Sequence, residues 1–188
     1  MDGRGSLEIA AFQMDFENLV ISQVNGEGLP ELANAGTERF KGIETGVAYR
    51  MAGSWSVRAS YSFHDAKFRD FLTEFDGVPT QLGGKRLEMS ARHLASAGVI
   101  HASARGPLVG VEYNYVGDRY LNKRNTALAD SYGTVSASLG YRTKGWELRM
   151  DGRNLNDVRD PVSESELGDA QYYLMTARHF DVTLTKRF

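Results

Sequence analysis

The chain has 188 residues with 22 Lys and Arg against 24 Asp and Glu, which gives a formal net charge of −2. This balance argues against a strongly basic nucleic-acid binder, and the absence of cysteine excludes disulfide frameworks, thiolate metal sites and cysteine nucleophiles. Glycine is frequent, with 20 residues against 4 prolines.

The first half of the chain alternates apolar and polar residues with a period of two. This period predicts strands with one apolar and one polar face. The pattern covers 43–51 and 55–64, and in the first of these Ile43, Val47 and Tyr49 alternate with polar or small residues. Two further strands are predicted at 6–14 and 19–24.

The second half continues this pattern, with predicted strands over 94–104, 109–115, 135–142, 146–153 and 180–188. In 146–153 one face carries a row of four charged residues, namely Glu147, Arg149, Asp151 and Arg153. The whole chain therefore predicts about nine strands of the length that outer-membrane barrels use.

The connections between these strands alternate between short and long. The short ones are 15–18, 52–54, 105–107 and 144–145, and the long ones are 25–36, 69–87, 121–129 and 156–173. This alternation is typical of transmembrane barrels, which have short turns on one side of the membrane and long loops on the other. Aromatic residues near both strand ends also suit two interfacial girdles. We therefore predict an all-β fold, an antiparallel transmembrane β-barrel segment.

Three segments resemble motifs of the TonB-dependent outer-membrane receptors. Residues 34–44 read Asn-Ala-Gly-Thr-Glu-Arg-Phe-Lys-Gly-Ile-Glu, residues 153–157 read Arg-Asn-Leu-Asn-Asp, and residues 177–188 are similar to the family's last strand with its terminal Phe188. The resemblance implies that 1–188 is the C-terminal part of a larger, 22-stranded barrel, and that the signal peptide and the plug domain are absent from it.

The resemblance also implies a location and partners. The location is the outer membrane, with Phe188 on the periplasmic side. The partners are outer-membrane lipid, the barrel-assembly machinery, the TonB complex through the missing plug, and iron-siderophore or a similar scarce nutrient. Independently, nine strands would place residue 1 and Phe188 at opposite ends, and an odd number does not close in antiparallel fashion, which favours a piece of a larger barrel.

Candidate site residues fall into three groups. The last strand, as the assembly signal, offers Phe180, Val182, Leu184 and Phe188. The charged row at 147–153 is the candidate lumen wall, although cross-strand pairing with Arg142 or Ser138 is the alternative for each member. The loops 69–87 and 156–173 offer candidate ligand contacts, which are Arg69, Asp76, Lys85, Arg86, Asp160, Glu164 and Glu166; the acidic ones are otherwise solvated loop residues.

Catalytic, metal and cofactor sites are not expected. The four histidines, His64, His93, His101 and His179, lack metal-ligand spacing, and the chain has no defensible catalytic triad or carboxylate pair. Two other classes stay open: a stand-alone small outer-membrane barrel (porin, adhesin or structural protein), which needs an even number of strands, and a soluble β-sandwich binding module.

Overall fold

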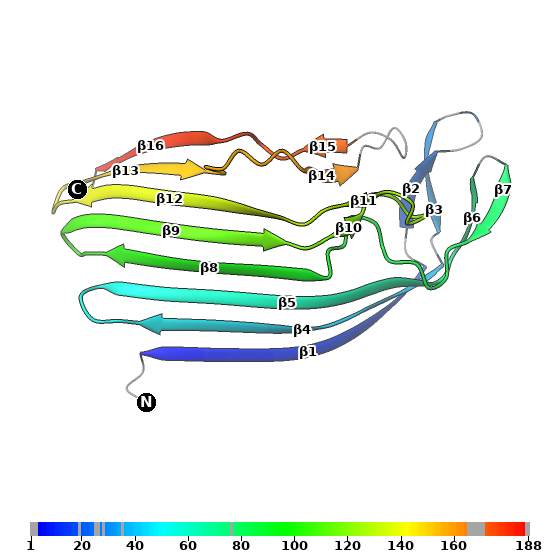
Figure 1. Cartoon of the computed structure of the whole chain (residues 1–188), viewed down its shortest axis with the longest axis horizontal. Coiled ribbons are helices and arrows are strands. Elements are labelled where there is room, and N and C mark those ends of the chain that lie inside the picture. The colour runs from blue at the N-terminus through cyan, green and yellow to red at the C-terminus, as the bar shows by residue number, and fades with distance from the viewer. Residues whose placement is uncertain are drawn as a thin grey trace.

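The computed structural model describes residues 4–18, 20–24, 27, 29–34, 36–75, 77–164 and 172–186. These residues form one eight-stranded antiparallel sheet with the strand order β1-β4-β5-β8-β9-β12-β13-β16 (Figure 1). The strands are β1 (Gly5–Glu17), β4 (Thr37–Arg50), β5 (Trp55–Asp70), β8 (His93–Ala102), β9 (Gly106–Val116), β12 (Tyr132–Arg142), β13 (Trp146–Arg153) and β16 (His179–Lys186).

Short hairpins lie at one end of this sheet, opposite the tight turns (Figure 1). They belong to the long connections and are β2 (Val20–Val24) with β3 (Pro30–Asn34), β6 (Leu72–Phe75) with β7 (Val78–Gln81), β10 (Arg119–Tyr120) with β11 (Leu128–Ala129), and β14 (Pro161–Glu164) with β15 (Tyr172–Leu174). We call this end the loop end and the other end the turn end. The fold class expected from the sequence is confirmed, as are three of the four short turns.

The predicted strand at 19–24 is the one that does not join the main sheet. β1 continues through the expected turn at 15–18 and pairs with β4 up to Glu17 opposite Thr37. The segment between them then folds on itself, with Val20 opposite Asn34. At 5 residues, β2 is about half as long as a membrane-crossing strand must be. The sheet therefore has eight strands rather than nine.

The even number changes where the ends of the chain lie. Because all neighbours are antiparallel, β1 begins and β16 ends at the turn end (Figure 1). Residue 1 and Phe188 lie outside the described residues, but the strands next to them start and end at the same end of the sheet, contrary to the prediction from nine strands, and an even number of strands no longer excludes antiparallel closure. Among the described strands, β1 and β16 form the two edges of the sheet and do not pair with each other.

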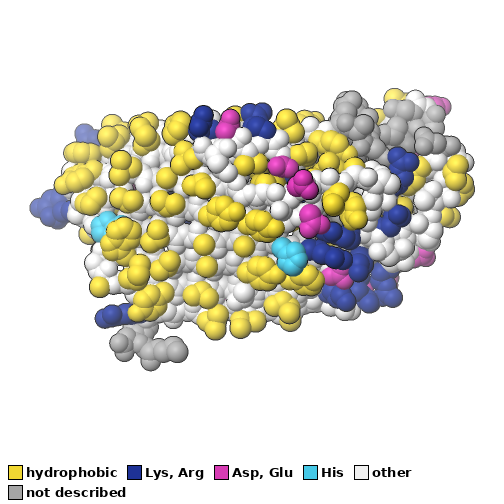
Figure 2. All heavy atoms as spheres, viewed as in Figure 1, with side chains coloured by type: hydrophobic (Ala, Val, Ile, Leu, Met, Phe, Trp, Pro, Cys, Tyr) yellow, Lys and Arg dark blue, Asp and Glu magenta, His cyan; other side chains and the backbone are white. Residues whose placement is uncertain are grey.

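The two faces of the sheet differ sharply in chemistry. One face, which we call the apolar face, carries side chains such as Val47, Val111, Leu139 and Val182, all exposed. Leu184 on the edge strand is 70% exposed. Figure 2 shows hydrophobic side chains spread over this face of the sheet. The opposite, polar face carries the charged and hydroxyl side chains of the alternate residues.

The buried core lies at the loop end instead of on the sheet. Phe68, Phe71 and Leu82 pack together there, with Phe75 and Leu87 against them. The side-chain oxygen of Gln81 accepts hydrogen bonds from the backbone amides of Phe71 (3.0 Å) and Gly83 (2.9 Å). The base of the loop after β5 is thus a packed unit. Among the described residues, none lies in a helix long and apolar enough to cross a membrane.

Candidate functional site

The charged row of β13 lies on the polar face and is paired with its neighbours. Arg142 of β12 donates from Nε to Glu147 Oε2 at 2.7 Å, so the cross-strand alternative holds for Glu147. Arg149 Nη2 lies 2.6 Å from Asp151 Oδ1 within the same strand. Arg153 Nε is 4.0 Å from Asp181 Oδ2 of β16. Each of the four predicted residues therefore has a partner of opposite charge.

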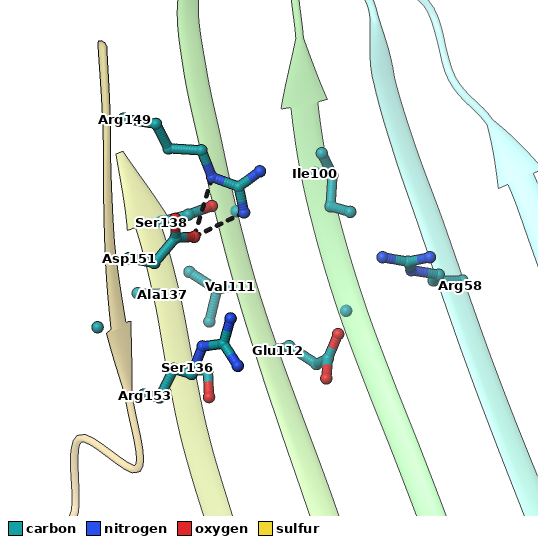
Figure 3. A pocket seen from close by; sticks show the side chains of 13 residues that line it. Arg58, Ile100, Val111, Glu112, Ser136, Ala137, Ser138, Arg149, Asp151 and Arg153 are labelled. Carbon is teal, nitrogen blue, oxygen red and sulfur yellow. Dashed lines mark hydrogen bonds and ion pairs between the residues drawn. The ribbon is translucent and has the colours of Figure 1, made fainter. Parts of the chain in front are cut away.

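A shallow hollow of about 270 Å³ opens on the polar face beside this row. Its lining comes from β5, β8, β9, β12 and β13, and its polar members are Arg58, Glu112, Ser136, Ser138, Arg149, Asp151 and Arg153. Figure 3 shows Arg149 and Asp151 joined on one side and Arg58 on the other, with Glu112 between them. Glu112 also accepts a hydrogen bond from Asn114 (2.8 Å).

Two glycines, Gly98 and Gly110, help to keep this hollow open, because side chains in their place would point toward Glu112 and Ser138 on its lining. At Gly110 an added Cβ would lie 2.7 Å from Ser138 Oγ, closer than such contacts ordinarily come. The result is a polar wall of mixed charge, suited to water, ions or polar solutes. The described residues contain no cluster of three His, Asp or Glu side chains placed to hold a metal ion.

The loop between β5 and β8 is tied to the loop between β9 and β12. Lys85 Nζ donates to the carbonyl of Arg124 (2.8 Å). Asn125 accepts from the amide of Arg86 and donates to its carbonyl, both at 2.8 Å. The Arg86 side chain, in turn, forms an ion pair with Asp118 at 3.1 Å. The two predicted ligand residues Lys85 and Arg86 thus lie together and help to hold two loops in place.

The loop between β9 and β12 is tied to the loop between β13 and β16 through Arg119, which is 2% exposed. Its guanidinium contacts Asp160 Oδ1 at 3.5 Å and the carbonyl of Pro161, and it covers the ring of Tyr132 at 4.9 Å. A buried guanidinium is held most securely when several acceptors share its donors. Arg119 was not among the predicted site residues, because a single Arg before a long loop carries no sequence signal of burial.

The segment 153–157 that carries a family-like motif forms a turn with a clear structural task. Asn154 is buried and donates to the carbonyls of Val158 (2.8 Å) and Thr176 (2.9 Å). Asn156 bonds β12 through the Val135 amide (3.0 Å) and the Gly133 carbonyl (2.7 Å). The positive φ of Asn154, 50°, is a conformation that Asn tolerates better than most residues. This turn holds the ends of β12, β13 and the segment before β16 together.

Glu38 at the loop end of β4 is a buried acid that the sequence did not single out. Along β4, Glu38 lies beside the charged residues Arg39 and Lys41, which replace apolar residues such as Ile43 on the apolar face. It is therefore beyond the part of β4 that could contact hydrocarbon. Burial, with the nearby Glu88 carboxylate adding to it and Lys123 opposing it, raises the pKa of Glu38 to about 7. Glu38 therefore titrates near neutral pH.

The remaining predicted site residues are scattered. Arg69 does not lie with Lys85 and Arg86; it pairs with Asp15 of β1 at 3.7 Å. Phe180, Val182 and Leu184 are exposed on the apolar face. Glu164 ends β14, whereas Asp76, Glu166 and Phe188 lie outside the described residues.

Comparison with known proteins identifies similar sequences and folds. The family described as "TonB dependent receptor-like, beta-barrel" matches residues 1–155. The ferrioxamine receptor of Yersinia enterocolitica is 25% identical over 130 residues, which cover 67% of this chain and 17% of that protein.

Solved structures show the same fold at lower identity. The siderophore receptor PiuA of Acinetobacter baumannii aligns with a TM-score of 0.76 at 20% identity, over 98% of this chain and 26% of its own. The ferric yersiniabactin uptake receptor FyuA of Yersinia pestis aligns with a TM-score of 0.70 at 19% identity, over 100% of this chain and 28% of its own. The chain thus spans between 17% and 28% of the length of these relatives.

Proposed function

Because the chain belongs to the TonB-dependent receptor-like β-barrel family, a family of outer-membrane proteins, we propose that it is the C-terminal part of the barrel of a receptor that imports siderophore-bound iron or another scarce nutrient. Its domain is the whole of 1–188, and the rest of the barrel and the plug complete the protein. Ferrioxamine, named for one relative, belongs to the proposed class of ligand.

One observation carries this proposal: the eight-stranded sheet leaves its apolar face uncovered and both of its edges unpaired within the described residues. Soluble monomers rarely expose so large an apolar surface to water. Open sheet edges are also unfavourable in lipid, because each unpaired backbone group costs several kcal/mol there. Lipid against the face and further strands against β1 and β16 satisfy both conditions.

The polar face then forms part of the lumen wall. The charged row of β13 faces the lumen in this arrangement. Its four members are Glu147, Arg149, Asp151 and Arg153, so the wall is strongly polar but the row carries no net charge. The loops 69–87 and 156–173 contribute to ligand binding on the extracellular side, and Lys85, Arg86 and Asp160 hold these loops in place. The missing plug makes the contact with the TonB complex.

The direction of insertion follows from the loops. Long loops of outer-membrane barrels are extracellular and short turns are periplasmic, so the turn end and the C-terminus lie in the periplasm. The last strand, with Phe180, Val182, Leu184 and Phe188, is the segment that the barrel-assembly machinery recognises. Deleting Phe188 is expected to lower the amount of heat-modifiable protein in the outer membrane, and an unchanged amount would refute this role.

Uptake is tested by growth under iron limitation. A strain that lacks its other receptors and expresses the protein should grow on one or more ferric siderophores, and growth should require TonB. Absence of growth on every siderophore in a panel, with the protein correctly inserted, would leave another nutrient as the cargo. Growth without TonB would contradict the proposal.

A stand-alone small barrel is the second candidate, favoured by the even number of strands. It requires β1 to pair with β16. Cysteines placed on facing positions of these two strands would form a disulfide in a closed eight-stranded barrel, and they would stay apart if other strands lie between them. A soluble protein that is monomeric and folded without detergent would contradict both barrels.

A further inference from the structure

A group of basic side chains lies on the apolar side of the sheet, directly beyond the last apolar residues of β4 and β5. Arg39 is opposite Lys67, and Lys41 is opposite Asp65. These positions continue the alternation of Ile43 and Phe63, so their side chains leave the sheet on the same side. Figure 2 shows Lys and Arg side chains gathered where β4 and β5 reach the loop end. We call Arg39, Lys41, Lys67 and Arg69 the basic cluster.

The basic cluster encloses a hollow of about 300 Å³. All four basic side chains line it, together with Asp65, Phe68 and Gly84. Among the described residues, Asp65 is the one carboxylate in this lining, and Asp15 of β1 pairs with two of the cations from outside it, so four cations against two carboxylates leave an excess of positive charge. Its volume suits a group of the size of one or two phosphates.

Two carboxylates hold the basic side chains in place without neutralising them. Asp65 lies 3.1 Å from Lys67 Nζ and 4.0 Å from Lys41 Nζ. Asp15 of β1 lies 2.7 Å from Arg39 Nε and 3.7 Å from Arg69 Nη1. The side chain of Lys41 is still 54% exposed, so donors remain available to an anion.

We propose that the basic cluster binds the phosphate groups of an anionic lipid headgroup in the leaflet around the loop end, an inference that rests on the membrane placement proposed above. Lys and Arg side chains at the edge of an apolar belt reach toward the headgroup layer, and each attracts anionic lipid at that level. Arg adds a planar pair of donors that matches phosphate geometry.

The position of the basic cluster favours a lipid, rather than a free anion, as its ligand. The cluster is on the apolar side, away from the polar face that would meet a solute in the lumen. Apolar residues of β4 and β5, such as Ile43 and Val57, continue from it toward the turn end and would contact acyl chains. A lipid gains both contacts at once, whereas inorganic phosphate gains only the charged one.

The test measures binding of lipid A, which carries two phosphates, to the purified protein in a non-ionic detergent. Dephosphorylated lipid A and inorganic phosphate are the comparison ligands. The variant Lys41→Gln with Lys67→Gln should bind lipid A about tenfold more weakly, the scale of one to two charge-assisted contacts. Binding by the unaltered protein should weaken as salt rises.

The matched control is Arg105→Gln with Lys144→Gln, which removes the same charge from exposed turns at the other end. This control should bind lipid A like the unaltered protein. Equal binding of dephosphorylated lipid A, equal loss in the control, or inorganic phosphate bound as tightly as lipid A would overturn the inference. If the double variant does not fold, each single lysine variant replaces it.

Heat-modifiable mobility of the unaltered protein separates this inference from the proposed function. A protein that inserts and supports uptake but does not prefer phosphorylated lipid contradicts the lipid site alone. A protein that does not insert contradicts the membrane placement itself.

Discussion

The sheet and the base of its loops are stabilised in different ways. On the sheet, apolar side chains such as Val111 and Leu139 are exposed, so their burial must come from surroundings outside the described chain. At the loop end, Phe68, Phe71 and Leu82 bury one another, and polar ties such as Arg86 with Asp118 connect neighbouring loops. In the proposed membrane placement the sheet depends on lipid for its stability, whereas the loop base carries its own core.

The sharpest way to test this difference is to remove a large side chain from each region. Phe68 is 1% exposed, and Phe68→Ala is expected to lower the free energy of opening of the loop base by about 3–5 kcal/mol, as a core cavity does. Hydrogen exchange over 68–87 would measure this. Leu139→Ala on the apolar face should have a much smaller effect, because lipid fills the space. Equal effects would contradict the comparison.

A charged side chain on the apolar face should lower the stability of the sheet in lipid. Val111 lies in the middle of β9, between Val99 and Ala137, and Val111→Arg is expected to destabilise the membrane-inserted state by about 2–4 kcal/mol. Unfolding in lipid vesicles would measure the change. Ser136→Arg on the polar face, opposite Glu112, is the control and should change stability little. A tolerated Arg at 111 would mean that this face is not in lipid.

The stability of the loop base should also depend on pH, and this is the smallest of the expected effects. Because the pKa of Glu38 is raised from 4.5 to about 7, the folded state binds a proton that the unfolded state has released, and stability falls as pH rises through this window. The loss is at most about 3 kcal/mol.

Glu38→Gln should remove this part of the pH dependence. The measurement is the thermal midpoint of the detergent-solubilised protein between pH 5 and pH 8, with and without the substitution. Glu44→Gln, at a half-exposed acid of the same strand, is the control. If the unaltered protein and Glu38→Gln show the same slope, Glu38 does not titrate in this range.

Most of the sheet was predictable because alternation is a local property. The segments 43–51, 55–64 and 146–153 each show one apolar and one polar face in the sequence, and the structure places each in the main sheet. The segment 19–24 was also predicted to be a strand, but whether it joins the main sheet depends on how far β1 pairs with β4, a contact between residues distant in the sequence. Strand count and the placement of the ends followed from that pairing.

The candidate site was predictable only in part. Alternation was enough to place Glu147, Arg149, Asp151 and Arg153 on one face, because side-chain direction repeats every two residues in a strand. The ties made by Arg86, Arg119 and Asn156 join loops that are far apart in the chain. Their long-range partners, such as Asp160 for Arg119, are set by the order of strands in the sheet and not by local pattern.

The glycine surplus shows the same division. Glycine within a strand permits close approach of other groups, but the structure alone shows where it is needed: at Gly42 an added Cβ would run into the carbonyl of Phe63, whereas Gly46 has open space around it. By itself the sequence determined the fold class, the two faces and the family resemblance, because these depend on local periodicity and motifs. Tertiary structure alone decided the eight-strand order, the packed loop base and the basic hollow, because each depends on which distant segments become neighbours.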